Sequence, residues 1–289
     1  MNLKKFSGVV LSCILAGTFL TGCGNDSGSQ DSPKTRIGII TKLNASEETL
    51  NEHLKQLEKV SRIPTINVAH NHHYYEGINS LMMGIEAKQI DEISTYNSVA
   101  NYMTAKNPNL EILNHTVNMY DSFCCAVRKD ENNLRENFNS AIQSMKDDGT
   151  LENLTKTYIT DLNPNENPPS VAMPHFDGAE TVKIGVTGDL PPLDLILADG
   201  KPAGFNTAVL AEISKRIGKN FEIINIDSNS RAAALTSKQI DVVFWVNVPG
   251  EFWYAEDAGN APQDIDKTAD LEITAPYCKD EIVHIGLKK

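Results

Sequence analysis

Apolar positions fall into short continuous runs separated by stretches with helical spacing, and this alternation predicts the secondary structure. In residues 36–160 it predicts strands at 37–40, from 90 and across 116–128, and helices at 46–60, 77–88, 134–145 and 151–159. From 181 on it predicts strands at 182–187, 221–226 and 241–246, and helices at 207–217 and 231–237. Asn206 and Gly218 are the expected N-cap and terminator of the 207–217 helix. Strands that alternate with helices imply parallel-rich sheets with helices on both faces, an α/β fold.

Residues 1–22 have the pattern of a secretion signal. Lys4 and Lys5 precede an apolar run from Val9 to Leu20, which is too short to span a bilayer stably. The closing Leu-Thr-Gly-Cys23 resembles a bacterial lipobox, which implies cleavage before Cys23 and acylation of that cysteine. A plain secretory signal with an accidental cysteine is the alternative.

Residues 23–35 indicate a flexible tether, because they are polar and rich in Gly and Ser. Acyl chains on Cys23 would hold the domain at the lipid bilayer, on the outer face of the bacterial cytoplasmic membrane. Each buried methylene contributes about 0.8 kcal/mol to such anchoring.

Composition restricts the partners and the redox state. The net charge is −12, and removal of a signal that holds lysines but no acids makes the mature chain more acidic, which argues against a nucleic-acid partner. Cys124, Cys125 and Cys278 remain, an odd number, so buried reduced thiols are expected. A disulfide between Cys278 and either Cys124 or Cys125 is the alternative.

Residues 161–180 separate two stretches of ordinary globular composition. Their Asn163-Pro-Asn-Glu-Asn-Pro-Pro169 run suits neither a helix nor a sheet interior, so we expect a linker.

Two sets of motifs carry a family resemblance. The second stretch contains Thr181-Val-Lys-Ile-Gly-Val-Thr-Gly-Asp-Leu-Pro-Pro-Leu193, then Gly204-Phe-Asn206 and Asp241-Val-Val-Phe-Trp245. It resembles the first lobe of bacterial extracellular solute-binding proteins, family 3, the polar amino-acid type. The first stretch contains Gly77-Ile-Asn-Ser-Leu-Met-Met-Gly84 and Met145-Lys-Asp-Asp-Gly149. It is similar to the second lobe and the closing helices of the same family.

The resemblance implies a circularly permuted, two-lobe periplasmic-binding-protein-like (type II) fold, because the later part comes first. Lobe two is expected at 36–123, the returning hinge strand and closing helices packed on lobe one at 124–160, and lobe one with the outgoing hinge strand at 181–289. At roughly 3.3 Å per residue the 161–180 linker spans about 66 Å, enough to join neighbouring termini. A monomer is therefore expected, and a swapped dimer is the alternative.

The residues that follow strands are the candidates for the ligand site, since a cleft forms at the carboxyl ends of parallel strands. In lobe one they are Asp189, Leu190, Asn206, Arg231, Trp245 and Asn247. In lobe two they are Asn44, Ser46, Tyr75, Tyr96, Asn97 and Tyr120.

Several family positions differ in this chain. The aromatic platform near the Pro-Pro turn is replaced by Leu190 and Leu193, the arginine after the 241–246 strand is absent, and Tyr96 stands where an acid would hold an α-ammonium. Arg231, at a predicted helix start, could grip a carboxylate instead; a surface residue or internal ion pair is the alternative. Trp245 and Asn247 are expected to share one face of a strand end, with core packing the alternative for Trp245.

A histidine-rich segment, His70-Asn-His-His73, raises the question of a metal. No Cys or carboxylate falls at a familiar ligand spacing, so no metal site is predicted, and a loop is expected with Tyr74 or Tyr75 facing the cleft. No catalytic motif and no cofactor motif is present.

The resemblance implies a lipid-anchored receptor that captures a small polar solute, an amino acid or related carboxylate, by hinge closure and delivers it to an ABC permease. A sensory or structural lipoprotein that kept the fold without import is a second hypothesis. A dehydratase-like enzyme on the same scaffold is a third, with Asp189 and Glu76 as its candidate acid or base.

Overall fold

The computed structural model describes residues 35–40, 70–113, 119–249 and 270–289, all within one compact unit. The predicted 46–60 helix, the signal and the tether lie outside the described residues. The helices and helical turns are α2 (Ile78–Glu86), α3 (Asn97–Lys106), α4 (Asn132–Asp147), α5 (Thr150–Thr155), the π-helical turn η1 (Lys156–Thr160), α6 (Phe205–Ile217), the 3-10 turn η2 (Ser228–Ser230) and α7 (Arg231–Thr236). Among the described residues, no helix is both long and apolar enough to cross a membrane.

Ten strands form one mixed sheet in the order β10-β6-β11-β5-β13-β3-β1-β2, with β12 beside β5 and β4 beside β13. Their bounds are β1 Thr35–Ile40, β2 His70–Tyr75, β3 Glu92–Tyr96, β4 Leu110–Leu113, β5 Met119–Arg128, β6 Thr181–Val186, β10 Asn220–Asn225, β11 Val242–Pro249, β12 Leu271–Ile273 and β13 Cys278–Leu287. A small sheet holds β7 (Asp189–Leu190), β8 (Asp194–Ile196) and β9 (Pro202–Ala203). The α/β prediction is confirmed.

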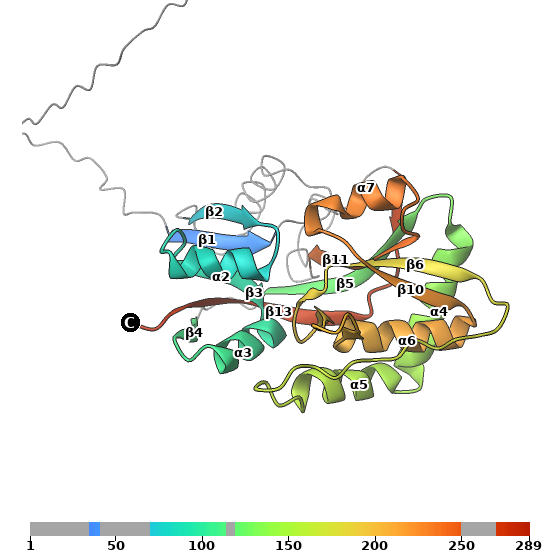
Figure 1. The fold of residues 1–289 in the computed structure, drawn as a ribbon, viewed down its shortest axis with the longest axis horizontal. Coiled ribbons are helices and arrows are strands. Elements are labelled where there is room, and N and C mark those ends of the chain that lie inside the picture. The colour runs from blue at the N-terminus through green and yellow to red at the C-terminus, as the bar shows by residue number, and fades with distance from the viewer. Residues whose placement is uncertain (1–34, 41–69, 114–118, 250–269) are drawn as a thin grey trace, which may run out of the picture. The chain divides into compact units, whose positions relative to one another are not determined.

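Parallel pairing occurs at both ends of the large sheet, and antiparallel pairing in its middle. β10, β6 and β11 are mutually parallel neighbours, as are β3, β1 and β2. We call β6–β11 with α4–α7 the β6 group, and β1–β4 with α2 and α3 the β1 group. Between them lie β5 and β13, which pair with each other and also with β11 and β3, respectively (Figure 1).

Helices cover both faces of the β6 group, and the alternation of β11 shows why. Val242 and Phe244 are fully buried in the cluster that also contains the α4 and α6 side chains Phe138 and Val209. Val243 belongs instead to a second cluster with the α7 residues. Since successive strand side chains point to opposite faces, one strand supplies two cores. Figure 1 shows α7 on one side of these strands and α4 and α6 on the other.

The N-terminus of α6 differs from the prediction. Gly204 (φ 96°) is the N-cap, and a Cβ there would meet the carbonyl oxygen of Pro192. The backbone N–H groups of Phe205 and Asn206 donate to the carbonyls of Pro192 (3.1 Å) and Leu193 (2.8 Å). Backbone carbonyls therefore satisfy N–H groups that a side-chain cap was expected to satisfy. The prediction that Asn206 is the N-cap is wrong. The C-cap at Gly218 (φ 67°) is confirmed.

The histidine-rich segment is also not the predicted loop. Residues 70–75 form β2, which pairs in parallel with β1 along its whole length. The pairing satisfies the backbone of a segment whose tyrosines and histidines were too polar to indicate a strand. Within the described residues, no group of three His, Cys, Asp or Glu side chains is arranged to hold a metal ion.

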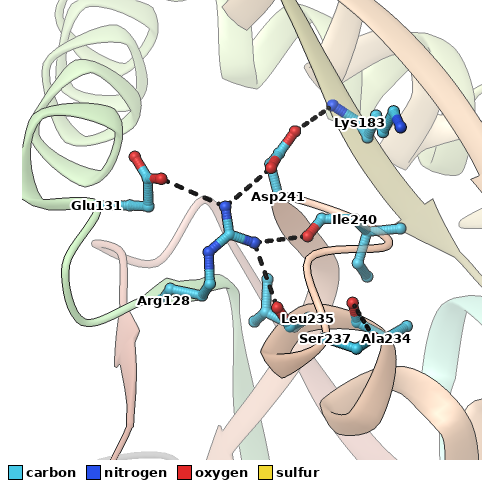
Figure 2. A network of polar contacts seen from close by, with 8 residues as sticks. All are labelled: Arg128, Glu131, Lys183, Ala234, Leu235, Ser237, Ile240 and Asp241. Carbon is cyan, nitrogen blue, oxygen red and sulfur yellow. Dashed lines mark hydrogen bonds and ion pairs between the residues drawn. The ribbon is translucent and has the colours of Figure 1, made fainter.

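A buried arginine ties the two separated stretches of the chain together (Figure 2). Arg128, at the end of β5, donates through Nη1 to the carbonyls of Ile240 (2.7 Å) and Leu235 (3.2 Å). Its Nη2 pairs with Asp241 at 2.8 Å and with Glu131 at 3.3 Å. Asp241 in turn accepts from the backbone N–H of Lys183 at 3.0 Å. The end of β5 is thereby fixed to the starts of β6 and β11.

Candidate functional site

The loop after β6 is held by one buried carboxylate. Asp194, on β8, accepts hydrogen bonds from the N–H and Oγ1 of Thr187 (both 3.1 Å) and from the N–H of Gly188 (2.9 Å). Burial raises the pKa of Asp194 to about 6, against the lowering effect of these donors. The loop that carries Asp189 and Leu190 is thus fixed from within.

Trp245 occupies a bulge in β11. Phe244 and Val246 pair with the consecutive residues Cys125 and Cys124 of β5, and Trp245 (φ 50°) is the extra residue between them. Its indole Nε1 donates to Thr187 Oγ1 at 3.3 Å, so the ring is turned toward the loop after β6. Trp245 and Asn247 were predicted to share one face because side chains alternate along a strand. The bulge breaks this alternation, so the prediction loses its basis.

Arg231 is directed into the protein. It is only 1% exposed, its Nε donates to the Ser228 carbonyl at 2.9 Å, and its Nη1 donates to the Trp245 carbonyl at 3.0 Å. Its guanidinium also lies over the Trp245 ring. The cation predicted to grip a solute carboxylate therefore binds carbonyls of its own chain and helps to fix the β11 bulge.

Asp189 reaches the β1 group. Its carboxylate faces the first turn of α2: a Cβ built on Gly77, the N-cap, would meet Oδ2, and the backbone N–H of Ile78 acts to lower the pKa of this carboxyl. Burial raises the pKa of Asp189, while hydrogen bonds from Thr187 and Ile78 and the charge of Arg231 act in the opposite direction. A second contact lies nearby, because Asn229 of η2 donates to Glu76 Oε1 at 2.9 Å.

An aromatic row runs across the same region. Tyr96 and Phe123 meet edge to face with ring centroids 4.7 Å apart, and Phe123 meets Trp245 at 6.3 Å. The Tyr96 hydroxyl donates to Asp121 at 3.1 Å. These residues come from β3, β5 and β11, so the row connects the β1 group with the β6 group through a crossing strand.

The two crossing strands carry facing carboxylates. Asp121 of β5 and Asp280 of β13 are register partners. Asp280 accepts from Ser98 Oγ at 2.5 Å and from the Ser98 N–H at 3.3 Å, near the start of α3. Burial raises the pKa of Asp280, against the effect of the Ser98 hydrogen bonds.

The remaining predicted residues are dispersed. Leu190 is buried in the main core. Asn206 is buried too, and its Oδ1 accepts from the Tyr277 hydroxyl at 3.1 Å. Tyr75 packs so closely on α2 that a Cβ on Gly84 would strike its hydroxyl. Asn97 accepts from Asn101 within α3, and the Tyr120 ring lies 5.3 Å from the Lys279 ammonium. Asn44, Ser46, Cys23 and the side chain of Asn247 lie outside the described residues.

The structure thus brings together Asp189, Arg231, Trp245 and Tyr96, and adds residues that sequence reasoning missed. Asp194 could have been found, because it is a single acid between Leu193 and Leu195 in an otherwise apolar run. The contributions of Gly77 and Asn229 had no local signal, since each depends on a segment far away in the sequence.

The three described cysteines, Cys124, Cys125 and Cys278, form no disulfide with one another. Burial raises the pKa of Cys125, and raises that of Cys278 to about 12, so both are protonated thiols near neutral pH. Cys124 and Cys125 are buried, as predicted, whereas Cys278 is partly exposed.

Residues 182–246 match the family model of bacterial extracellular solute-binding proteins, family 3. The match confirms the predicted resemblance. These residues run from β6 through the Trp245 bulge and include Asp189, Asp194, Asn229 and Arg231. A comparison with curated protein sequences finds no match.

Solved structures that are similar to this chain show low sequence identity. The ligand-binding component of an ABC-type import system from Staphylococcus aureus, with zinc bound, is 13% identical with a TM-score of 0.40, over 87% of this chain and 66% of that one, slightly under two thirds. The probable amino-acid ABC transporter extracellular-binding protein YtmK from Bacillus subtilis is 11% identical, with a TM-score of 0.39, over 89% and 85%. A Burkholderia cenocepacia nutrient-binding protein bound to methionine is 9% identical, with a TM-score of 0.38, over 88% and 84%. At these scores the similarities support no conclusion about the ligand.

Proposed function

We propose that the protein is a substrate-binding protein of an ABC importer, which captures a small polar solute by hinge closure without covalent chemistry. The family match over residues 182–246 is the observation that carries the proposal. The β6 group corresponds to lobe one and the β1 group to lobe two, with β5 and β13 as the hinge strands between them. The solute lies where the loop after β6 and the β11 bulge face the first turn of α2.

The geometry suits a binding protein of this kind. The two groups approach each other twice: Asp189 lies against Gly77 at the start of α2, and Phe123 of β5 contacts both Tyr96 and Trp245. Closure around a solute replaces its hydration by fixed donors, acceptors and rings. Among amino acids and related carboxylates, the ligand must be one that needs no clamp from Arg231, because that guanidinium binds Trp245 and Ser228.

Acylation of Cys23 anchors the chain at the membrane surface, and residues 24–34 act as a flexible tether. The binding domain then stays beside the permease that receives its solute. The permuted order is compatible with this role, since the 161–180 linker only has to join neighbouring ends of one lobe.

A thermal-shift screen tests the proposal, because a ligand that binds only the folded state raises the melting temperature in proportion to RT ln(1 + [L]/Kd). The panel contains the common amino acids, small mono- and dicarboxylates, and amines. One solute class is expected to stabilise the protein, and Trp245→Ala should abolish that shift. Asp199→Asn, which alters an exposed ion pair with Lys201 at 2.7 Å, is the matched control. A folded protein that responds to no solute would contradict the proposal.

A sensory or structural lipoprotein is the second candidate, favoured by the internal engagement of Arg231. Affinity purification from detergent-solubilised membranes separates the two. The importer proposal predicts that a permease copurifies with the protein. The second candidate predicts that no permease does.

A further inference from the structure

The first turn of α2 faces a carboxylate from the other strand group. Gly77, its N-cap, has no side chain to satisfy the exposed N–H groups, and no side-chain cap is present on the helix itself. The Asp189 carboxylate lies against Gly77, where the Ile78 N–H acts to lower its pKa. A carboxylate at a helix N-terminus is favoured both by the hydrogen bond and by the helix dipole.

The contact is sterically matched. A Cβ built on Gly77 would collide with Oδ2 of Asp189, so only glycine lets this carboxylate approach so closely. Beside it, Asn229 Nδ2 donates to Glu76 Oε1 at 2.9 Å. Three consecutive residues, Glu76 to Ile78, thus meet two separate segments of the β6 group, β7 and η2.

We infer that Asp189 and Asn229 form a latch that holds the two strand groups closed when no solute is present. This inference rests on the proposed function in one respect, the identification of the two groups as hinged lobes. The latch uses the chain's own carboxylate at a position where a solute with an acidic group would compete. Capture then requires the latch to open first, which makes closure a property of the empty protein as well as of the loaded one.

The charged groups around the latch are consistent with a contact that is maintained rather than accidental. Asp189 lies near the buried Asp194 carboxylate, which disfavours a second negative charge, and near Arg231, which favours it. Glu76 adds a further carboxylate on the α2 side, held by the neutral Asn229 amide. Loss of the Asp189 carboxylate and of the Asn229 amide therefore removes both of the polar groups that the β6 group presents to residues 76–78 here.

Distance measurements in the solute-free protein test the latch. Spin labels on ketone-bearing unnatural side chains at Met83 of α2 and Gln239 after α7, both exposed, report the separation of the groups without using the native cysteines. The wild type should give one short population. Asp189→Ala combined with Asn229→Ala should shift it to longer, broader distances. Asp199→Asn, whose partner Lys201 belongs to the same group, should leave it unchanged.

Gly77→Ala provides an independent variant if the double substitution does not fold. Its methyl group displaces the Asp189 carboxylate while every polar partner remains, so the same lengthening is expected. Wild-type distances in both this variant and the folded double variant would overturn the latch. The result is separate from solute binding: a failed solute screen beside a lengthened distance would reject the importer and leave the latch standing.

Discussion

The guanidinium of Arg231 lies over the indole of Trp245, 4.9 Å from the ring centroid, and its Nη1 donates to the carbonyl of the same residue at 3.0 Å. Both residues are almost fully buried, at 1% and 4% exposure. Trp245 has a positive φ, which is strained for a residue with a side chain. The arginine therefore stabilises an unusual backbone at the point where β11 bulges.

Arg231→Met should destabilise the protein by about 2–4 kcal/mol, because two buried carbonyls lose their charged donor and the cation–π contact disappears. The free energy of unfolding in urea measures this. Arg36→Met is the matched control: its ion pair with Asp91 at 2.6 Å is about 40% exposed and screened by water, so its loss should cost much less than that of Arg231. Equal losses in the two variants would contradict the role assigned to Arg231.

Arg128→Met should cost more, about 3–5 kcal/mol, since Asp241 and the carbonyls of Leu235 and Ile240 all lose the same buried partner. The stretches of the chain before and after the 161–180 linker should also unfold less cooperatively with each other. Urea transitions followed by tryptophan fluorescence and by circular dichroism should coincide in the wild type and separate in the variant. Coincident transitions at wild-type stability would show that the network in Figure 2 is dispensable.

The elements were predictable where the pattern was local. Most strands and helices follow from apolar periodicity, as the five buried positions of α4 illustrate, since each lies three or four residues from another. β2 could not be found this way, because a strand of histidines and tyrosines becomes a strand only by pairing with β1. The sequence of β2 has no apolar pattern that would indicate a strand. Its strand conformation comes from pairing with β1.

The candidate site was harder to predict for the same reason. The ends of predicted strands directed attention to Asp189, Trp245 and Arg231, but not to what these residues contact. A bulge at Trp245 inverts the expected alternation, and Arg231 binds backbone carbonyls that no sequence motif marks. Contacts across the chain, such as Asp189 with Ile78, depend on how β5 and β13 cross.

Stability should depend on pH through Asp194. Its pKa is 3.8 as an ordinary carboxyl and about 6 in the folded protein, so the folded state binds the proton more tightly. The stabilisation is complete below the unfolded pKa and is lost as the pH rises toward about 6, on the order of 3 kcal/mol in all.

Asp194→Asn removes this titration and keeps the shape of the side chain. Urea unfolding between about pH 4 and pH 7 should therefore give a difference between wild type and variant that favours the wild type at low pH and shrinks on the way to neutrality. The amide can accept fewer of the three hydrogen bonds from Thr187 and Gly188, which lowers the variant's stability at every pH. A difference that does not change with pH would contradict the assignment.

Cys23→Ser should release the protein from the membrane, because serine offers no thiol for acylation. In cell fractionation the wild type is expected in the membrane pellet and the variant in the soluble fraction or medium. Mass spectrometry of the N-terminal peptide should find acyl chains on Cys23 of the wild type. Cys278→Ser, which changes a thiol inside the folded domain, should leave the distribution unchanged.

The permutation predicted from the sequence can be tested by reversing it, because the strand ends that must be joined lie close together. Gly286 near the end of β13 and Ile37 near the start of β1 both pair with Glu92 of β3. The two strands therefore end and begin at the same edge, about 10 Å apart across one intervening strand. A short Gly/Ser bridge from Lys289 to Thr35 should join them without moving either.

A re-permuted chain opened at Asn165 and closed by that bridge should fold and bind the same solute as the original. Its free energy of unfolding should fall by only about 1–2 kcal/mol, because opening the linker loosens the Tyr102–Asn167 hydrogen bond (3.0 Å) and the Lys106 contact to the Asn165 carbonyl. A second permutant, opened after Asp280 inside β13, should not fold, since it divides a crossing strand that pairs with β5 and β3. If the first permutant also remains unfolded, the permuted two-lobe arrangement is wrong. The 161–180 linker then has a structural role beyond joining the two stretches of the chain.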